Sequence, residues 1–203
     1  MDKVKLAVIY YSATGTNFRM AQAAAKAAPD STVDVRLRKV RELAPAEAIA
    51  ANPAWQAHIQ ATKEVPVAVP EDVEWADALI LSTPTRFGNL AAQMKQFLDT
   101  LGGLWAQGKT VNKVVSAMTS AQNPHGGQET TLLSLYTTMY HWGTIVVPPG
   151  YTDPVIFGAG GNPYGTSVTA ETTGEITEEA VRAVEYQARR VITVAEWIRK
   201  GRS

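Results

Sequence analysis

The sequence predicts a doubly wound α/β fold: a five-stranded parallel sheet with helices on both faces. Short apolar runs alternate with helix-length segments along the chain, and the runs are continuously apolar instead of alternating with polar residues. Such runs are typical of parallel strands that are covered on both faces. Strands that alternate with helices indicate crossover connections within one sheet.

The expected strands are the apolar runs 5–11, 33–40, 78–82, 113–118 and 144–147. Periodic segments predict helices at 17–28, 90–101, 128–142 and 178–200, and a weaker pattern favours one near 46–62. Two stretches, 41–75 and 148–174, interrupt the alternation and contain eight of the eleven prolines. We interpret the chain as one domain, 1–203, with these two excursions carrying function or subunit contacts.

Composition excludes several classes of function. The 203 residues are 45% hydrophobic, and 19 basic side chains balance 19 acidic ones. A net charge of zero argues against a broad nucleic-acid or membrane footprint. The absence of cysteine excludes disulfides, thiolate catalysis and cysteine-ligated metal. No signal segment and no long apolar run is recognised, so we expect a cytoplasmic protein without nucleic-acid or membrane partners.

The loop after the first strand is rich in hydroxyls and lacks charge: it contains Ser12, Thr14, Gly15, Thr16 and Asn17. A strand that turns directly into a helix directs free N–H groups and the positive end of the helix dipole at the turn, which favours an anion. The loop has neither the lysine of a P-loop nor the three glycines of a dinucleotide fingerprint. It suits one terminal monophosphate held without a fixed cation, or it only caps the helix.

Two further loops follow strands at the same predicted edge. "PTRFG" at 84–88 follows the third strand, with Asn89 expected to cap the next helix, and "SAQNPHGG" at 120–127 follows the fourth. Open α/β sheets bind ligands at this edge. None of the three loops contains a carboxylate, and Arg86 is their one fixed charge, which suits a ligand that gains negative charge, such as a reduced flavin. Taken singly, each loop is also compatible with an ordinary turn. The glycine-rich segment 155–161 lacks a following helical period, so we assign it no dinucleotide site.

The chain resembles the tryptophan-repressor-binding protein (WrbA) family of flavodoxin-like NAD(P)H:quinone oxidoreductases. The resemblance covers nearly the whole chain and rests on "YYSATGTNFRMA", "TPTRFGNLAAQMKQFLDTLGGLW", "GGQETTL", "HWGTIVVPPGY" and "GGNPYGTSVTA". It implies a flavodoxin-like fold, FMN as the cofactor, a homotetramer, and two-electron reduction of quinones by NADH or NADPH.

Carried over by position, the resemblance implies three cofactor-binding loops. The phosphate loop is Ser12, Ala13, Thr14, Gly15, Thr16 and Asn17. The ring-binding loop is Pro84, Thr85, Arg86, Phe87 and Gly88. The third loop is Ser120, Ala121, Gln122, Asn123, His125 and Gly126.

Two further residues match functional positions of the family, and two departures stand out. His141 matches a flavin-contacting histidine, our candidate for the catalytic residue, and Trp105 matches a quinone-contacting tryptophan. Thr14 replaces a tyrosine often associated with dinucleotide contact, and the third loop is longer than is usual in the family. On the residues alone, His141 also fits a helix C-terminus, and Trp105 fits a core.

No histidine has a carboxylate at ligand spacing, so we expect no metal. Two alternatives to the enzyme stay open at this point: a one-electron flavodoxin-type carrier and a regulatory accessory protein. Carriers of this fold usually dock by charge complementarity, which a neutral chain does not favour.

Overall fold

The sheet is built around a central path of parallel strands. In the computed structural model, which describes residues 3–170 and 173–201, this path runs β2-β1-β3-β5-β6. The strands are β1 (Val4–Tyr10), β2 (Val33–Lys39), β3 (Ala78–Arg86), β5 (Val114–Ala121) and β6 (Ile145–Val146). The order reverses between β1 and β3, so the predicted doubly wound parallel arrangement is confirmed.

The prediction of five strands was wrong, because the sheet has seven strands within the described residues. β4 (Asn89–Leu90) forms an antiparallel hairpin with β3, and β7 (Ser167–Thr169) pairs with β5. β6 pairs with the start of β5 at Val114 and Val115, whereas β7 pairs with its end, from Thr119 onward. The fifth strand is therefore divided in two, with the excursion inserted between its halves.

Between the parts of β5 that pair with β6 and with β7, side chains provide the hydrogen-bond partners for the backbone of Ala117. The Ala117 N–H donates to the Tyr136 hydroxyl at 3.1 Å, and the Ala117 carbonyl accepts from Gln187 Nε2 at 2.9 Å. Gln187 is fully buried, and its Oε1 accepts from the Thr166 N–H at 2.7 Å. Burial raises the pKa of the Tyr136 hydroxyl to about 12, so this group remains a neutral donor and acceptor.

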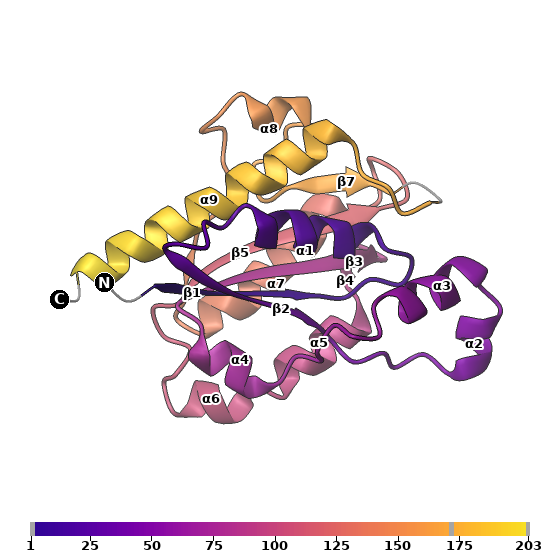
Figure 1. Ribbon diagram of the computed structural model, residues 1–203, viewed down its shortest axis with the longest axis horizontal. Helices are drawn as coiled ribbons and strands as arrows, with labels where there is room; N and C mark the ends of the chain where they lie inside the picture. The colour runs from indigo at the N-terminus through magenta and orange to yellow at the C-terminus, as the bar shows by residue number, and fades with distance from the viewer. Residues whose placement is uncertain (1–2, 171–172, 202–203) are drawn as a thin grey trace.

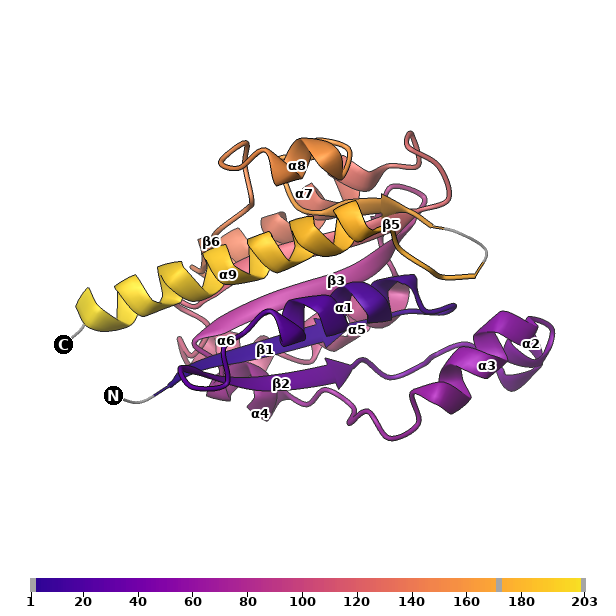
Figure 2. The same ribbon diagram turned by 45° about the horizontal axis from the view of Figure 1, so that its top comes forward.

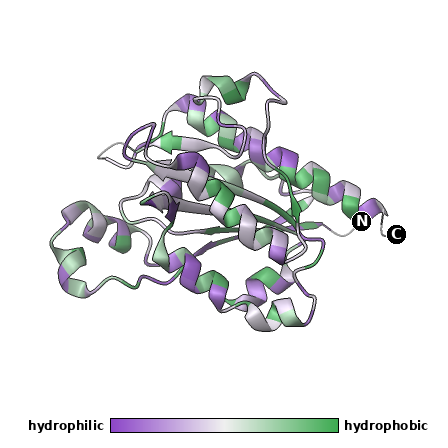
Figure 3. Cartoon of the chain, turned by 180° about the vertical axis from the view of Figure 1, so that it is seen from behind, coloured by the Kyte–Doolittle hydropathy of each residue, from purple (hydrophilic) through white to green (hydrophobic). Residues whose placement is uncertain are grey.

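Helices cover both faces of the sheet, as Figures 1 and 3 show. α1 (Thr16–Lys26) and α9 (Glu178–Gly201) pack on one face, and their apolar residues join one core cluster. α4 (Pro70–Trp75), α5 (Ala92–Asp99) and α7 (Gln128–His141) contribute to a second cluster on the other face. The helices are striped with hydrophobic and hydrophilic residues (Figure 3), because each buries only one side. The short α6 (Gly102–Ala106) and α8 (Val155–Gly158) lie in connections.

The first excursion contains α4 and, before it, two helices in the region near 46–62 where one was expected. α2 (Ala46–Ala50) and α3 (Pro53–Ala61) are separated at Asn52, whose side chain accepts from the Trp55 N–H at 3.1 Å and caps α3. Pro53 at the first position of α3 has no N–H to continue α2, which explains the break. Both helices project beyond the carboxyl ends of the strands (Figures 1 and 2).

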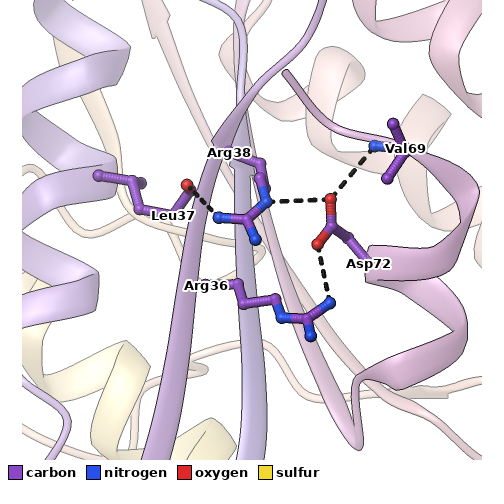
Figure 4. Close-up of polar contacts among 5 residues, drawn as sticks. All are labelled: Arg36, Leu37, Arg38, Val69 and Asp72. Carbon is purple, nitrogen blue, oxygen red and sulfur yellow. Dashed lines mark hydrogen bonds and ion pairs between the residues drawn. The ribbon is translucent and has the colours of Figure 1, made fainter. Parts of the chain in front are cut away.

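The excursion returns to the sheet through α4, which a buried carboxylate fixes to β2 (Figure 4). Asp72, 2% exposed, pairs with Arg36 Nη1 and with Arg38 Nε, each at 3.0 Å. The same carboxylate accepts from the Val69 N–H at 3.2 Å and so caps the start of α4. Among the described helices, none is both long and apolar enough to cross a membrane.

Candidate functional site

The three predicted loops meet at a cavity of about 280 Å³ at the carboxyl edge of the sheet. Each loop leaves one of the adjacent strands β1, β3 and β5, so the parallel arrangement places all three at this edge. The predicted site residues that line the cavity are Ser12, Ala13, Thr14, Thr16, Asn17, Pro84, Thr85, Arg86, Ser120, Ala121 and Gln122.

The first loop turns sharply from β1 into α1 around Gly15. Gly15 has a φ of 110°, which favours glycine, and its N–H donates to Ser12 Oγ at 3.0 Å. α1 begins at Thr16, and none of the described side chains caps it, so its first-turn N–H groups are available to a ligand at the cavity. The alternative that Ser12 and Thr16 serve only as caps of α1 is therefore not supported.

Asn17 connects the first loop to the ends of the other two strands. Its Nδ2 donates to Ser82 Oγ at 3.1 Å, and its Oδ1 accepts from Ser120 Oγ at 2.6 Å. Asn17 is 1% exposed, so the three strand ends are fixed together beneath the cavity. Thr16, 3% exposed, differs: its hydroxyl has no hydrogen-bond partner among the described residues.

A cation lies beside the first loop, although the loop itself has none. A Cβ placed on Gly15 would lie 2.6 Å from Arg19 Nη1 and 3.7 Å from His58 Nδ1. Arg19 also pairs with Glu175, which directly follows the second excursion, Nη2 to Oε1 at 2.5 Å. Burial, followed by the nearby charges of Arg19 and Lys39, lowers the pKa of His58 to about 4. His58 is therefore neutral at pH 7, and Arg19 is the fixed charge on this side.

The second loop is a tight hairpin. Thr85 and Arg86 of β3 pair with Leu90 and Asn89 of β4, and the turn residues Phe87 and Gly88 have φ angles of 53° and 79°. Two successive positive φ angles are typical of a type I′ turn. The expectation that Asn89 caps α5 was wrong, because Asn89 belongs to β4 and Ala91 is the N-cap.

Several predicted residues lie outside the cavity lining. Phe87 is fully exposed at the hairpin tip, and His125 lines a separate cavity beside the second excursion. The remaining predicted residues of the three loops that do not line the cavity are Gly15, Gly88, Asn123 and Gly126. Among the described parts of the chain, no group of three or more histidine, aspartate or glutamate side chains is placed to hold a metal.

The structure does not bring His141 and Trp105 to this cavity within one chain. The start of α7 lies against the hairpin, where a Cβ on Gly127 would be 2.7 Å from the Gly88 Cα. His141 is the last residue of this 14-residue helix, about 21 Å away along its axis. Trp105 lies beside it, and its Nε1 donates to the His141 carbonyl at 2.9 Å.

Three lining residues were not predicted: Asn52 and Trp55 from α3 and its cap, and Ala170 after β7. They come from the two excursions, which we expected to carry function or subunit contacts, but none of the three was predicted as a site residue. Tryptophan in a stretch otherwise rich in alanine and polar residues was the available signal. The assembled site combines a helix N-terminus, a buried hydroxyl without a partner among the described residues, and a lining that contains Arg86 but no carboxylate. Together these features can hold one phosphate monoester and an attached ring system.

Comparison with known proteins agrees with a site for a phosphate monoester that carries a ring system. A model of the NADPH-dependent FMN reductase family matches residues 4–153. An NAD(P)H dehydrogenase (quinone) of Deinococcus radiodurans is 56% identical over 190 residues, covering 93% of this chain and 94% of the relative. The enzyme of the same name from Aromatoleum aromaticum is 41% identical over 207 residues, covering 98% and 100%.

Solved structures support the fold. A WrbA-like flavodoxin from Agrobacterium tumefaciens superimposes with a TM-score of 0.67 at 23% identity, covering 96% of this chain and 99% of that one. An archaeal flavodoxin superimposes with a TM-score of 0.58 at 16% identity, covering 97% and 99%. The fold is therefore flavodoxin-like, as the resemblance implied.

Proposed function

The chain belongs to the NADPH-dependent FMN reductase family, and on this premise we propose the following function and site. The protein is an FMN-dependent NAD(P)H dehydrogenase that reduces quinones to hydroquinones. We further place it in the WrbA branch of the family. The proposal treats residues 1–203 as one FMN-binding domain, of which 1–2, 171–172 and 202–203 lie outside the described residues.

The observation that carries the proposal is the convergence of three carboxylate-free loops on one cavity beside the uncapped start of α1. FMN fits these residues, because the buried Thr16 hydroxyl has no hydrogen-bond partner within the described part of the chain and a phosphate oxygen would supply one. The first-turn N–H groups of α1 provide further donors to the phosphate. Hydroxyl and amide groups of the other loops suit the polar edge of the ring.

When bound, FMN supplies two-electron redox chemistry between a reduced nicotinamide and a quinone. The protein binds and orients the reactants. Thr16 and the start of α1 hold the phosphate, and Arg86 supplies positive charge at the ring-binding end. No carboxylate in the three loops opposes negative charge that accumulates in the cavity during reduction. Since one cavity serves both reactants, the oxidised nicotinamide leaves before the quinone enters.

We propose that the working site is shared between subunits of a homotetramer. His141 and Trp105 lie together at the opposite edge of the sheet from the cavity of their own chain. Both side chains are exposed, so they are available to the cavity of a neighbouring subunit. There His141 acts as a hydrogen-bond donor near the quinone oxygen, and Trp105 forms a stacking wall for a planar quinone.

The test is cofactor binding followed by rapid kinetics. We expect equilibrium dialysis to show that FMN binds far more tightly than FAD, because the first loop provides a site for a single terminal phosphate. Stopped-flow mixing should show rapid two-electron reduction by NADH or NADPH and reoxidation by benzoquinone, with ping-pong steady-state kinetics. Equal affinity for FAD would contradict the cofactor assignment. Reduction in two well-separated one-electron steps, with slow reoxidation by quinone, would favour a carrier instead.

Location and other partners remain predictions from the sequence. A neutral chain without cysteine is consistent with a cytoplasmic enzyme that has no nucleic-acid or membrane partner.

A further inference from the structure

We propose that Trp55 is a further cofactor-binding residue, whose indole packs against the flavin ring, and that Glu42 is the positioning residue that holds it there. This inference rests on the proposed FMN-dependent function. Among the described residues that line the cavity, Trp55 is the only aromatic one. The other lining side chains are small or polar, apart from Arg86, so the apolar faces of a planar ring would otherwise have little aromatic surface to contact.

Trp55 is held by both its backbone and its side chain. Its N–H donates to Asn52 Oδ1 at 3.1 Å at the start of α3, and its indole Nε1 donates to Glu42 Oε2 at 3.1 Å. The one polar atom of the indole is therefore satisfied on the side of Glu42. What the residue presents to the cavity is the apolar ring, which suits stacking and not hydrogen bonding.

Glu42 collects donors from elements far apart in the sequence. Its carboxylate accepts from the Tyr11 hydroxyl at 3.0 Å and from Gln93 Nε2 of α5 at 2.8 Å. The N–H groups of Leu43 and Ala44 donate to it at 2.8 and 2.9 Å. The carboxylate therefore joins the excursion to the end of β1 and to the helix that follows the ring-binding loop.

The charge of Glu42 is stable. Burial opposes ionisation, but hydrogen bonds from Ala44, Gln93, Leu43 and Tyr11 together outweigh it and lower the pKa of the Glu42 carboxyl. A carboxylate with this many donors is a rigid anchor, because turning it would break several charge-assisted bonds at once. Trp55 is consequently fixed on the side of the cavity formed by the β3 hairpin, where we place the ring.

The experiment compares FMN with riboflavin, which has the same ring but no phosphate. We expect Trp55→Ala to weaken both ligands by the same factor, about tenfold, since the lost contact is with the ring. Trp55→Phe should retain most of the affinity for both. The control is Trp197→Ala, a tryptophan on α9 that is more exposed than Trp55 and does not line the cavity, and it should change neither dissociation constant.

Fluorescence gives a second readout that a merely structural role would not change. An indole in contact with a flavin quenches its emission by electron transfer, and a phenyl ring does so far less. Bound FMN should therefore fluoresce several-fold more strongly in Trp55→Phe than in the wild type. Glu42→Ala, which frees the indole, should raise the emission and weaken both ligands in the same direction as Trp55→Ala.

Unchanged affinity and unchanged emission in the Trp55 variants would overturn the inference, and so would a loss confined to FMN. If Trp55→Ala does not fold, the emission of Trp55→Phe still decides the question. Failure of the wild-type protein to bind either flavin would overturn the proposed function instead.

Discussion

Thr16 and Asn17 are adjacent in the chain but differ in how their side chains are satisfied. Asn17 bonds to Ser82 and Ser120 and fixes the strand ends, so it serves the structure. The Thr16 hydroxyl is buried without a partner in the described structure, so it costs stability unless a ligand completes it. This contrast favours a binding role for the Thr16 hydroxyl and a structural role for the Asn17 side chain, although both residues line the cavity.

We expect Thr16→Val to separate stability from binding. Valine has nearly the same shape but no hydroxyl, so the free energy of unfolding of the apoprotein should stay the same or rise by up to about 1 kcal/mol. FMN should bind roughly tenfold to hundredfold more weakly, because a hydrogen bond to a charged group is lost. Urea unfolding and equilibrium dialysis measure the two effects. An equal loss of riboflavin affinity would contradict the assignment of Thr16 to the phosphate.

His58 should make the stability of the apoprotein depend on pH. Its pKa is about 4 in the folded protein and about 6.5 when unfolded. Between these values the unfolded chain takes up a proton and the folded one does not, so stability is lost as the pH falls from about 6.5 to 4. His58→Gln should flatten this part of the curve, measured by urea unfolding at several pH values. An unchanged slope would show that other groups are responsible.

At the scale of elements, the second excursion divides the fifth strand, and side chains supply the hydrogen-bond partners of the Ala117 N–H and carbonyl in the gap. Gln187 from α9 replaces the missing strand partner, since it contacts the Ala117 carbonyl, the Thr166 N–H and Ser116 Oγ. Gly165 lies so close that a Cβ would be 2.2 Å from the Ala117 oxygen. A glutamine and a glycine therefore allow 20 residues to be inserted into a sheet edge at the cofactor side.

We expect Gln187→Leu to destabilise the protein by roughly 3 kcal/mol, because it leaves the Thr166 N–H and the Ala117 carbonyl buried without partners. The measurement is urea unfolding of the apoprotein. Gln56→Leu, at an exposed position of α3, is the control and should change stability little. If Gln187→Leu lowers the free energy of unfolding as little as the control does, water or another side chain can replace Gln187.

For the whole molecule, exposed apolar side chains follow α7. Leu133 and Tyr140 on its outer face are 41% and 64% exposed, and Phe87 and Trp105 lie near its two ends with exposures of 103% and 53%. Exposed apolar groups that follow one helix are typical of a protein interface. An assembly that covers α7 would also carry His141 and Trp105 toward another subunit.

Sedimentation velocity should therefore give a tetramer, or a dimer–tetramer equilibrium that FMN shifts toward the tetramer by linkage. Tyr140→Asp should shift this equilibrium toward smaller species, because it places a charge in an apolar contact. Trp197→Asp, at a similarly exposed position on α9, should leave the mass unchanged. A monomeric wild-type enzyme with full quinone reductase activity would contradict the shared site.

Trp105→Ala is expected to raise the KM for benzoquinone severalfold and to leave the dissociation constant of FMN close to its wild-type value. The reason is that, in the proposed tetramer, Trp105 contacts the quinone from a neighbouring subunit, whereas it does not line the cavity of its own chain. Steady-state kinetics and dialysis test this pair of values. A parallel loss of FMN affinity would place Trp105 against the cofactor instead.

The sequence by itself determined the parallel sheet and the cavity. Apolar runs identify the strands, and parallel strands bring the loops after β1, β3 and β5 to one edge. Eleven residues of these loops line the cavity, and they are among the positions that the family resemblance implied. The tertiary structure alone decided that Trp55 reaches the cavity, that the fifth strand is divided, and that His141 lies at the far edge. Glu42 holds Trp55, and Gln187 bridges the divided strand, through contacts with residues 51 and 70 positions away, which leave no periodic signal in the chain.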